Sequence, residues 1–160
     1  MLLWKRLEGQ SGHAAAWQLL EEAYGCCRDG KLPEIRRTEQ GKPYFLDSEL
    51  HFSLSHTKRH AFCCLAEKNV GLDAEEADRE ISMRLAERWL SPSERGRLAG
   101  AEDPRTALLR LWVLKEAYSK LTGRGLGDYL KDTDFSPEDS RIHIIEGCFV
   151  AVLEEDDHAL

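Results

Sequence analysis

Apolar side chains recur at helical spacing in four stretches of this 160-residue chain. In the first stretch, residues 13–26, Trp17, Leu20 and Tyr24 share one face, which predicts an amphipathic helix. Two later stretches begin with a serine or an aspartate followed by proline, and the last one stops at a glycine, as helices commonly do. The three later helices are expected at residues 81–90, from a Ser91 cap to about residue 99, and from an Asp103 cap to residue 120 or 121.

Shorter segments alternate between apolar and polar residues, or are apolar throughout, and predict strands. These strands are expected at residues 50–55, 61–66, 70–75, 142–145 and 148–153. The first two are neighbours joined by a basic turn at 56–60, and the last two form a hairpin around Glu146 and Gly147. Residues 41–45 contain glycine and proline, which predicts a loop leading into an extended segment.

This order of elements predicts the α+β class, with helices covering mixed sheets, because strands and helices do not alternate regularly. At this length one compact unit over residues 1–160 is expected. The succession of helix, strands, helices and strands further predicts two pseudo-symmetric halves, residues 1–69 and 70–153, followed by an acidic tail at 154–160.

Charge and composition exclude several classes of protein. Hydrophobic residues make up 42% and charged residues 32%, the balance of a globular domain. A net charge of -7 argues against binding to nucleic acid or to anionic membranes, since both need a basic field. No apolar run approaches the roughly 20 residues of a membrane-spanning helix, and the first residues lack the apolar core of a signal peptide, so a cytoplasmic protein is expected. The five cysteines match neither a disulfide framework nor a metal site, which predicts reduced thiols.

Three carboxylates are candidates for a metal site. Asp73 and Glu75 lie two residues apart on a predicted strand, so their side chains point to the same face. Two carboxylates this close repel each other, and Mg²⁺, which prefers oxygen ligands, relieves the repulsion. Glu116 lies on a largely apolar helix, where it is expected to be partly desolvated and to need a cation. Two simpler interpretations stay open: an exposed acidic pair on a strand edge, and an ion pair between Glu116 and Lys120.

Four segments, in order along the chain, resemble the 4'-phosphopantetheinyl transferase superfamily. They are GKP at 41–43, FSLSH at 52–56, VGLDAE at 70–75, and WVLKEAYSK at 112–120 followed by GRGL at 123–126. The last segment resembles the family signature WxxKEAxxK with a following GxGL. The resemblance implies the family's two-halved α+β fold with a shortened N-terminal half. It also implies an enzyme that transfers the 4'-phosphopantetheine arm of coenzyme A to a serine of a carrier protein and releases adenosine 3',5'-bisphosphate.

The resemblance implies roles for individual residues. Asp73, Glu75 and Glu116 would hold Mg²⁺ together with the coenzyme A pyrophosphate. Lys115 and Lys120 would contact phosphates, and Lys120 would assist the leaving group.

Further roles concern the nucleotide end of coenzyme A and the proton of the attacking serine. Lys42 and Pro43 would lie beside the adenine, while Ser55 and His56 would lie near the 3'-phosphate. A simple turn histidine is the alternative for His56. Glu116 and Glu94 are the candidates for taking the proton. The place of Glu94 three residues after Ser91 is also explained by a capping box.

The implied partner is an apo acyl or peptidyl carrier protein. Because carrier proteins are acidic and this chain is acidic too, docking is expected on a local basic patch: Met83, Arg84, Leu85, Arg88, Arg95 and Arg97. The basic segment expected to bind the 3'-phosphate is not recognisable, and the candidates to replace it are Lys5, Arg6, Arg36 and Arg37. A monomer with the coenzyme site between its halves is expected. Two other functions stay open: a module that binds coenzyme A or a carrier protein without transfer, and a Mg²⁺-dependent phosphodiesterase.

Overall fold

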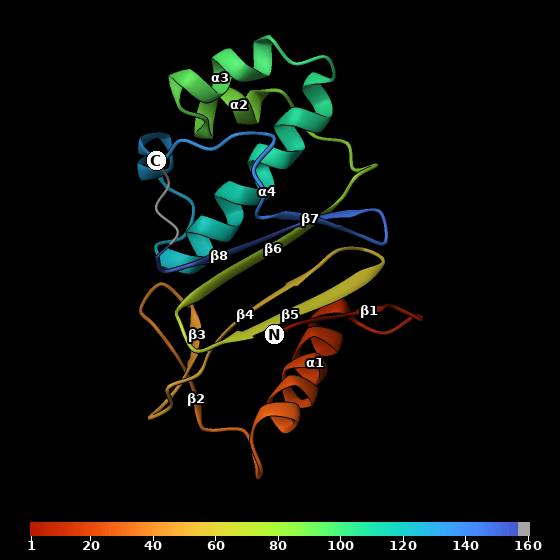
Figure 1. Ribbon diagram of the computed structural model, residues 1–160, viewed down its shortest axis with the longest axis vertical. Coiled ribbons are helices and arrows are strands. Elements are labelled where there is room, and N and C mark those ends of the chain that lie inside the picture. The colour runs from red at the N-terminus through yellow and green to blue at the C-terminus, as the bar shows by residue number, and fades with distance from the viewer. Residues whose placement is uncertain (157–160) are drawn as a thin grey trace.

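Strands fill the middle of an elongated molecule that has helices towards both ends (Figure 1). The computed structural model describes residues 1–156. The strands are β1 (Leu2–Arg6), β2 (Ile35–Arg37), β3 (Pro43–Phe45), β4 (His51–His56), β5 (His60–Ala66), β6 (Val70–Glu76), β7 (Ile142–Ile145) and β8 (Cys148–Glu154). The helices are α1 (Gly12–Cys27), α2 (Arg84–Trp89), α3 (Pro92–Ala99), α4 (Pro104–Thr122) and the 3₁₀ helix η1 (Asp128–Asp132).

The N-terminal half is an antiparallel sheet of order β1-β5-β4 with α1 packed against it. Ser11 caps α1 by accepting a hydrogen bond from the backbone of Ala14. The helix buries one face of small and branched residues against the sheet: Ala15, Ala16, Leu19, Leu20 and Ala23. This tertiary burial, rather than helix propensity alone, stabilises a helix of such length. The short hairpin of β2 and β3 lies beside this unit.

The C-terminal half is an antiparallel sheet of order β6-β8-β7 on which α4 lies. The Asp103 side chain caps α4 by accepting hydrogen bonds from the backbone of Arg105 and Thr106, each 3.1 Å long. Gly123 ends the helix in the left-handed region, with φ of 68°. The helix is buried along most of its length, from Ala107 to Leu121, so most of its surface packs against other parts of the protein.

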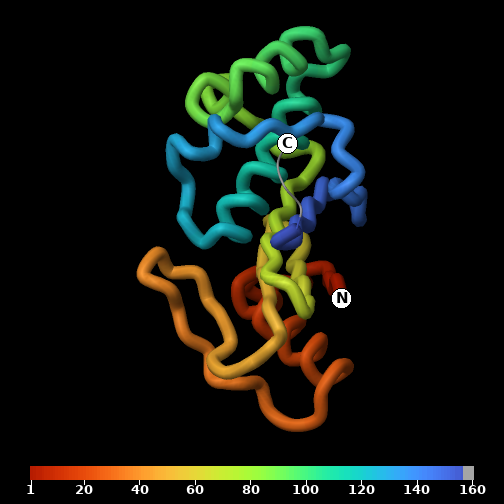
Figure 2. The backbone as a smooth tube through the Cα atoms, turned by 60° about the vertical axis from the view of Figure 1, so that its left-hand side comes forward, coloured from red at the N-terminus to blue at the C-terminus, as the bar shows by residue number. Residues whose placement is uncertain are grey.

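The two sheets meet at β4 and β6, where serine side chains take the place of a backbone ladder. The Ser53 hydroxyl accepts a hydrogen bond from the backbone of Leu72 at 2.9 Å, and the Ser55 hydroxyl accepts one from Ala74 at 3.2 Å. A shared apolar cluster joins the halves behind this contact: Phe62, Cys64, Val70, Leu72, Ala74, Cys148 and Val150. Figure 2 shows the two parts meeting through these strands.

Several sequence predictions are confirmed and others need correction. The α+β class is confirmed, as are the helices predicted near residues 13–26, 92–99 and 104–121. The helix predicted at 81–90 is shorter and begins at Arg84, where the preceding Met83 has no side chain able to cap it.

The sequence predictions were less accurate for β1, for the hairpin of β2 and β3, and for the end of β8. The predictions did not include β1 as a strand, and they gave only an extended segment where β2 and β3 form a hairpin. Glu154, expected in an acidic tail, is the last residue of β8, while residues 157–160 of that expected tail lie outside the described residues. Within the described part of the chain, no helix combines the length and apolar character needed to cross a bilayer.

Gly71 places the backbone of β6 directly against the backbone of α4. A Cβ atom at this position would lie 2.0 Å from the carbonyl oxygen of Ala117 and 2.5 Å from the nitrogen of Leu121. Both neighbours are main-chain atoms of a buried helix and cannot move aside. The close approach of β6 and α4 therefore depends on glycine at position 71.

We predict that Gly71→Ala destabilises the protein by about 3 kcal/mol or more, because the added methyl group forces the strand and helix apart. Urea unfolding measures this cost. Gly96→Ala is the matched control: Gly96 lies in α3 with open space around its Cα, and the change should stabilise the protein by about 0.5 to 1 kcal/mol. Equal effects of the two substitutions would contradict the close packing of β6 on α4.

Candidate functional site

A groove of about 1320 Å³ lies where the two halves meet. The start of α1, the turn between β4 and β5, the end of β6 and one side of α4 form its walls. The three predicted metal ligands, Asp73, Glu75 and Glu116, all line this groove, and so do Ser55 and Lys120. The fold thus gathers in one place residues from both halves that are far apart in the sequence.

Asp73 is the most deeply buried carboxylate of the groove, with 6% of its surface exposed. Its Oδ1 atom accepts hydrogen bonds from Lys120 Nζ at 2.7 Å and from the Ser55 hydroxyl at 3.0 Å. Its Oδ2 atom is buried and has no hydrogen-bond partner among residues 1–156. A buried carboxylate oxygen without a partner is costly, so this atom is suited to a further cation or donor.

Glu75 lies two residues along β6 and also lines the groove. Its carboxylate pairs with the guanidinium of Arg79, a residue that follows the end of the strand. Only 15% of the Glu75 side chain is exposed, compared with 44% for Arg79. Arg79 can therefore move into solvent and leave the carboxylate to another cation.

Glu116 enters the groove from α4. Burial, followed by the nearby charge of Asp73, raises the pKa of Glu116 from 4.5 to about 7, while Lys120 and Arg79 oppose the shift. The raised pKa shows that positive charge near this carboxyl is insufficient to offset its desolvation. Glu116 is therefore able both to bind a cation and to exchange a proton near neutral pH.

The donor atoms fit a hard divalent cation, although they do not form a ready cage. Within residues 1–156 no three histidine, cysteine, aspartate or glutamate side chains are grouped closely enough to hold a metal ion as they stand. Lys120 is already paired with Asp73, and Arg79 with Glu75. Mg²⁺ commonly binds through one or two carboxylates plus waters and ligand phosphates, so the oxygens of Asp73, Glu75 and Glu116 suffice.

The basic side of the groove comes mainly from the turn between β4 and β5. His56 is exposed and lies against the first residue of α1, since a Cβ on Gly12 would be 2.8 Å from its ring. Arg59 is engaged by two carboxylates at the end of β6 and the residues after it. Lys58 and Arg37 line the groove beside it, together with His56, and bring basic side chains to this end.

Lys42 and Pro43, expected together at the adenine, differ in their relation to the groove. Pro43 lines the groove and Lys42 does not, while both residues line two smaller cavities of about 400 and 240 Å³. Lys42 Nζ donates hydrogen bonds to Asn69 Oδ1 at 2.6 Å and to the Leu121 carbonyl at 2.8 Å, and burial lowers its pKa to about 8. In this structure Lys42 holds the N-terminal half to the end of α4, so the groove role predicted for it is not seen.

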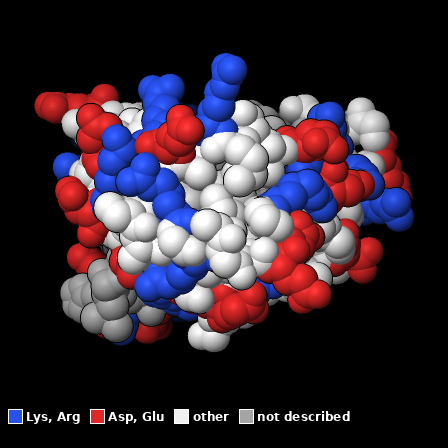
Figure 3. Space-filling model, turned by 90° about the horizontal axis from the view of Figure 1, so that it is seen from above, with Lys and Arg blue, Asp and Glu red and all other residues white. Residues whose placement is uncertain are grey.

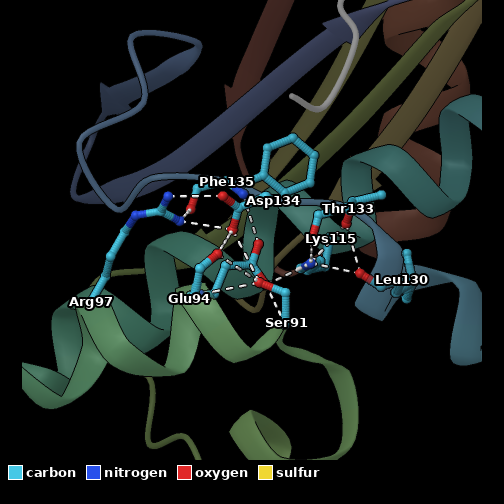
Figure 4. Close-up of polar contacts among 9 residues, drawn as sticks. Ser91, Glu94, Arg97, Lys115, Leu130, Thr133, Asp134 and Phe135 are labelled. Atoms are coloured by element: carbon cyan, nitrogen blue, oxygen red, sulfur yellow. Dashed lines mark hydrogen bonds and ion pairs between the residues drawn. The ribbon is translucent and has the colours of Figure 1, made fainter.

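The structure contradicts the groove roles predicted for Lys115 and Glu94 (Figure 4). Both side chains are fully buried, and Lys115 Nζ lies 2.7 Å from Glu94 Oε2. Neither residue lines the groove, because position 115 lies about 100° from position 116 around a helix. Burial lowers the pKa of Lys115, and Glu94 opposes that shift. Lys115 therefore does not reach a phosphate in the groove, and Glu94 does not take a proton there.

Glu94 instead completes the capping box that its spacing from Ser91 had offered as the alternative. Sequence reasoning missed Arg79 and Asn69, which organise Glu75 and Lys42. The only signal for Arg79 was its position four residues after Glu75, a spacing that brings side chains together on helices but not along a strand.

Comparison with known proteins identifies the family. A model described as the 4'-phosphopantetheinyl transferase superfamily matches residues 69–153, more than half of the chain. The chain belongs to this superfamily. It is 33% identical over 94 residues to the 4'-phosphopantetheinyl transferase gsp of Aneurinibacillus migulanus, covering 58% of this chain and 39% of that protein.

Two proteins of Bacillus subtilis are also similar. One, named 4'-phosphopantetheinyl transferase, is 30% identical over 128 residues, which covers 74% of this chain and 57% of the relative. The other, 4'-phosphopantetheinyl transferase Sfp of strain 168, is 35% identical over 91 residues, covering 55% and 40%. This chain therefore spans about half the length of the relatives that it matches.

The superfamily match has a clear relation to the groove. Residues 69–153 include β6, α4 and β8, and with them Asp73, Glu75 and Glu116. Ser55 and His56 precede the matched region and come from the N-terminal half. The superfamily segment thus supplies the acidic wall, and the preceding residues of this chain supply the basic end.

We predict that Glu116→Gln stabilises the metal-free protein at pH 8 by about 1 to 3 kcal/mol. The pKa of Glu116 is higher in the folded state, so the ionised carboxyl weakens folding as the pH rises from 4.5 through about 7. The gain should be small at pH 5, where the folded protein carries the neutral acid. Urea unfolding at both pH values, in EDTA, measures the difference. A gain that is the same at pH 5 and pH 8 would contradict the desolvated position of Glu116.

Proposed function

We propose that this chain transfers the 4'-phosphopantetheine group of coenzyme A to a serine of an apo acyl or peptidyl carrier protein, in a Mg²⁺-dependent reaction. The observation that carries the proposal is the groove itself, in which a buried aspartate, a glutamate of raised pKa and a lysine converge from β6 and α4. Membership of the superfamily supports the reaction type.

The acidic wall suits the diphosphate of coenzyme A. Asp73, Glu75 and Glu116 would hold Mg²⁺, whose charge stabilises the negative charge that develops on the pyrophosphate oxygens. Lys120, already 2.7 Å from Asp73 and 32% exposed, can turn from this carboxylate to the phosphate that leaves with the nucleotide. The Ser55 hydroxyl donates a hydrogen bond to Asp73 and so keeps that carboxylate oriented.

The proton of the attacking serine needs an acceptor in the groove. Glu116 lines the groove and is the candidate acceptor. Its pKa of about 7 in the metal-free protein would fall on binding Mg²⁺, which leaves an ionised carboxylate able to accept a proton. Glu94 does not compete for this role, since it is sealed on the other side of α4.

The basic end suits the nucleotide part of coenzyme A. The groove is larger than the 300 to 1,000 Å³ of most small-molecule pockets, as a ligand the size of coenzyme A requires. Arg37 and Lys58 provide positive charge for its 3'-phosphate, and His56 lines the groove with them. Arg37 is one of the residues proposed from the sequence to replace the unrecognised basic segment.

The structure removes one residue, Arg97, from the surface patch predicted to bind the carrier protein. Arg97 is bound to Asp134 through both of its terminal nitrogens and is not available to a partner. Arg84 and Arg88 of α2 are exposed next to Met83, which is 49% exposed. Figure 3 looks onto this end of the molecule, where basic and acidic side chains surround a largely uncharged centre. We propose that the acidic carrier protein docks over Met83, Arg84 and Arg88.

The central test is a mass-shift assay with an apo carrier protein and coenzyme A. We expect the carrier protein to gain the phosphopantetheine mass, and EDTA to abolish the gain. Asp73→Asn and Glu116→Ala should each reduce the rate about 100-fold or more, since each removes charge from the metal-binding wall. Glu21→Gln, a change to an exposed carboxylate of α1, is the control and should have no effect.

Two other results would replace the proposal. Binding of coenzyme A without any mass gain would favour a binding module. Release of free phosphopantetheine in the absence of carrier protein would favour a phosphodiesterase.

A separate prediction concerns docking. Arg84→Glu combined with Arg88→Glu should raise the Michaelis constant for the carrier protein about 10-fold, with little change in the constant for coenzyme A, because charge at an interface rim governs encounter with an acidic partner. Arg28→Glu with Lys31→Glu changes the net charge equally at exposed positions at and just beyond the end of α1, and serves as the control. Equal behaviour of the two double variants would exclude this patch.

A further inference from the structure

A buried polar network lies on the side of α4 that faces away from the groove (Figure 4). It joins Lys115 of α4 to Glu94 of α3 and to residues 130–135, a segment that begins in the last turn of η1 and continues beyond it. Both charged side chains are fully buried in the midst of apolar neighbours. The groove chemistry described above does not use either residue.

Lys115 is held by acceptors from two directions. Its Nζ atom lies 2.7 Å from Glu94 Oε2, 2.7 Å from the Leu130 carbonyl and 2.7 Å from the Thr133 hydroxyl, with the Thr133 carbonyl at 3.1 Å. Each ammonium proton therefore has a close acceptor. A small rotation of α4 would break charged hydrogen bonds in a place that water does not reach.

Glu94 is equally constrained. Its Oε2 atom accepts a hydrogen bond from the backbone of Ser91 at 2.7 Å in addition to the contact with Lys115. Its Oε1 atom accepts one from the backbone of Phe135 at 2.8 Å. One carboxylate thus fixes the start of α3, the segment 130–135 and the side chain of α4 relative to one another.

A buried ion pair of this kind is a poor source of stability, because apolar residues of similar volume commonly stabilise a core as well or better. The ion pair instead fixes the position of α4 relative to α3. Most of the other buried residues of α4 are apolar, and apolar contacts tolerate small shifts and rotations at less cost than charged ones. A charged contact with fixed acceptors does not tolerate them.

The rotation of α4 matters for the groove because Glu116 follows Lys115 directly. Side-chain atoms lie roughly 5 to 6 Å from a helix axis, so a rotation of about 10° displaces them by about 1 Å. A displacement of this size at reacting groups can lower a rate about 100-fold. Lys120 lies on the same flank as Glu116, four residues on, and would move with it.

We propose that the ion pair between Lys115 and Glu94 is the positioning device that sets the rotation of α4 and so places Glu116 and Lys120 in the groove. This inference rests on the proposed transferase function. Lys115 acts through Glu116 and Lys120 and does not touch the substrate. The relevant readout is therefore the turnover number rather than coenzyme A binding, since Arg37, His56 and Lys58 of the N-terminal half remain in place.

The first test uses Thr133, whose hydroxyl is one of the acceptors of Lys115. Thr133→Val removes the hydroxyl at nearly constant volume, and we expect kcat in the carrier-protein assay to fall about threefold to tenfold, with the Michaelis constant for coenzyme A within about twofold of wild type. Thr133→Ser retains the hydroxyl and should restore kcat. Equal kcat values for the two variants would overturn the proposal.

The second test removes both charges at once, through Glu94→Gln with Lys115→Met. This double variant leaves no unpaired buried charge, so its urea midpoint should stay near that of wild type, while kcat falls about 10-fold or more. Asp132→Asn is the matched control, because Asp132 lies in the same segment but is exposed to solvent; its kcat should be unchanged. A folded double variant with wild-type kcat would overturn the proposal.

The remaining outcomes are also decisive. If the double variant does not fold, the comparison of Thr133→Val with Thr133→Ser decides alone. If the wild-type chain transfers nothing, the proposed function fails. The positioning role is then judged by the rise in unfolding midpoint on adding MgCl₂ alone, which should be smaller for Thr133→Val than for Thr133→Ser because Glu116 is one of the residues that would bind the metal. An equal rise in both variants would overturn it.

Discussion

The hydrogen-bonded position of Asp73 is the constraint on which the groove depends. Asp73 is 94% buried, and a carboxylate that loses its hydration needs hydrogen bonds from the protein in its place. Ser55 of β4 and Lys120 of α4 donate these hydrogen bonds. These partners belong to the N-terminal sheet and to the helix of the C-terminal half. Docking of the halves and burial of the charge are therefore one event, and the unpartnered Oδ2 atom is what this arrangement leaves for a ligand.

The helix α4 meets two opposite requirements on its two flanks. Towards the groove, burial and the nearby charge of Asp73 raise the pKa of Glu116 to about 7 and leave it receptive to a cation or a proton. On the other flank, Lys115 and Glu94 form a buried ion pair, which fixes the rotation of α4 but contributes little to the stability of the fold. Adjacent residues of one motif thus serve different purposes, because a helix turns about 100° between them.

The sequence allowed most elements to be predicted, but it did not show which face of α4 lies towards the groove. Period and capping signals located α1, α3 and α4 and five of the strands, because these elements bury one face each. In α4 apolar residues surround the helix, so the pattern does not distinguish the flank of Lys115 from that of Glu116. The family motif grouped both lysines with the phosphates, and only the packing of α3 separates them. The strand β1 was missed because its pairing with β5 depends on the distant segment 60–64.

The N-terminal half, although it precedes the region that matches the superfamily, is part of the same site. Ser55 orients Asp73, and the backbone of β6 is bound to the serines of β4 at two points. Lys42 adds a third connection at the far end of α4. Without these contacts Asp73 and its neighbours on β6 would face water, and the repulsion that favours a cation would be screened. The electrostatic character of the groove is thus a property of the junction between the halves, and neither half produces it alone.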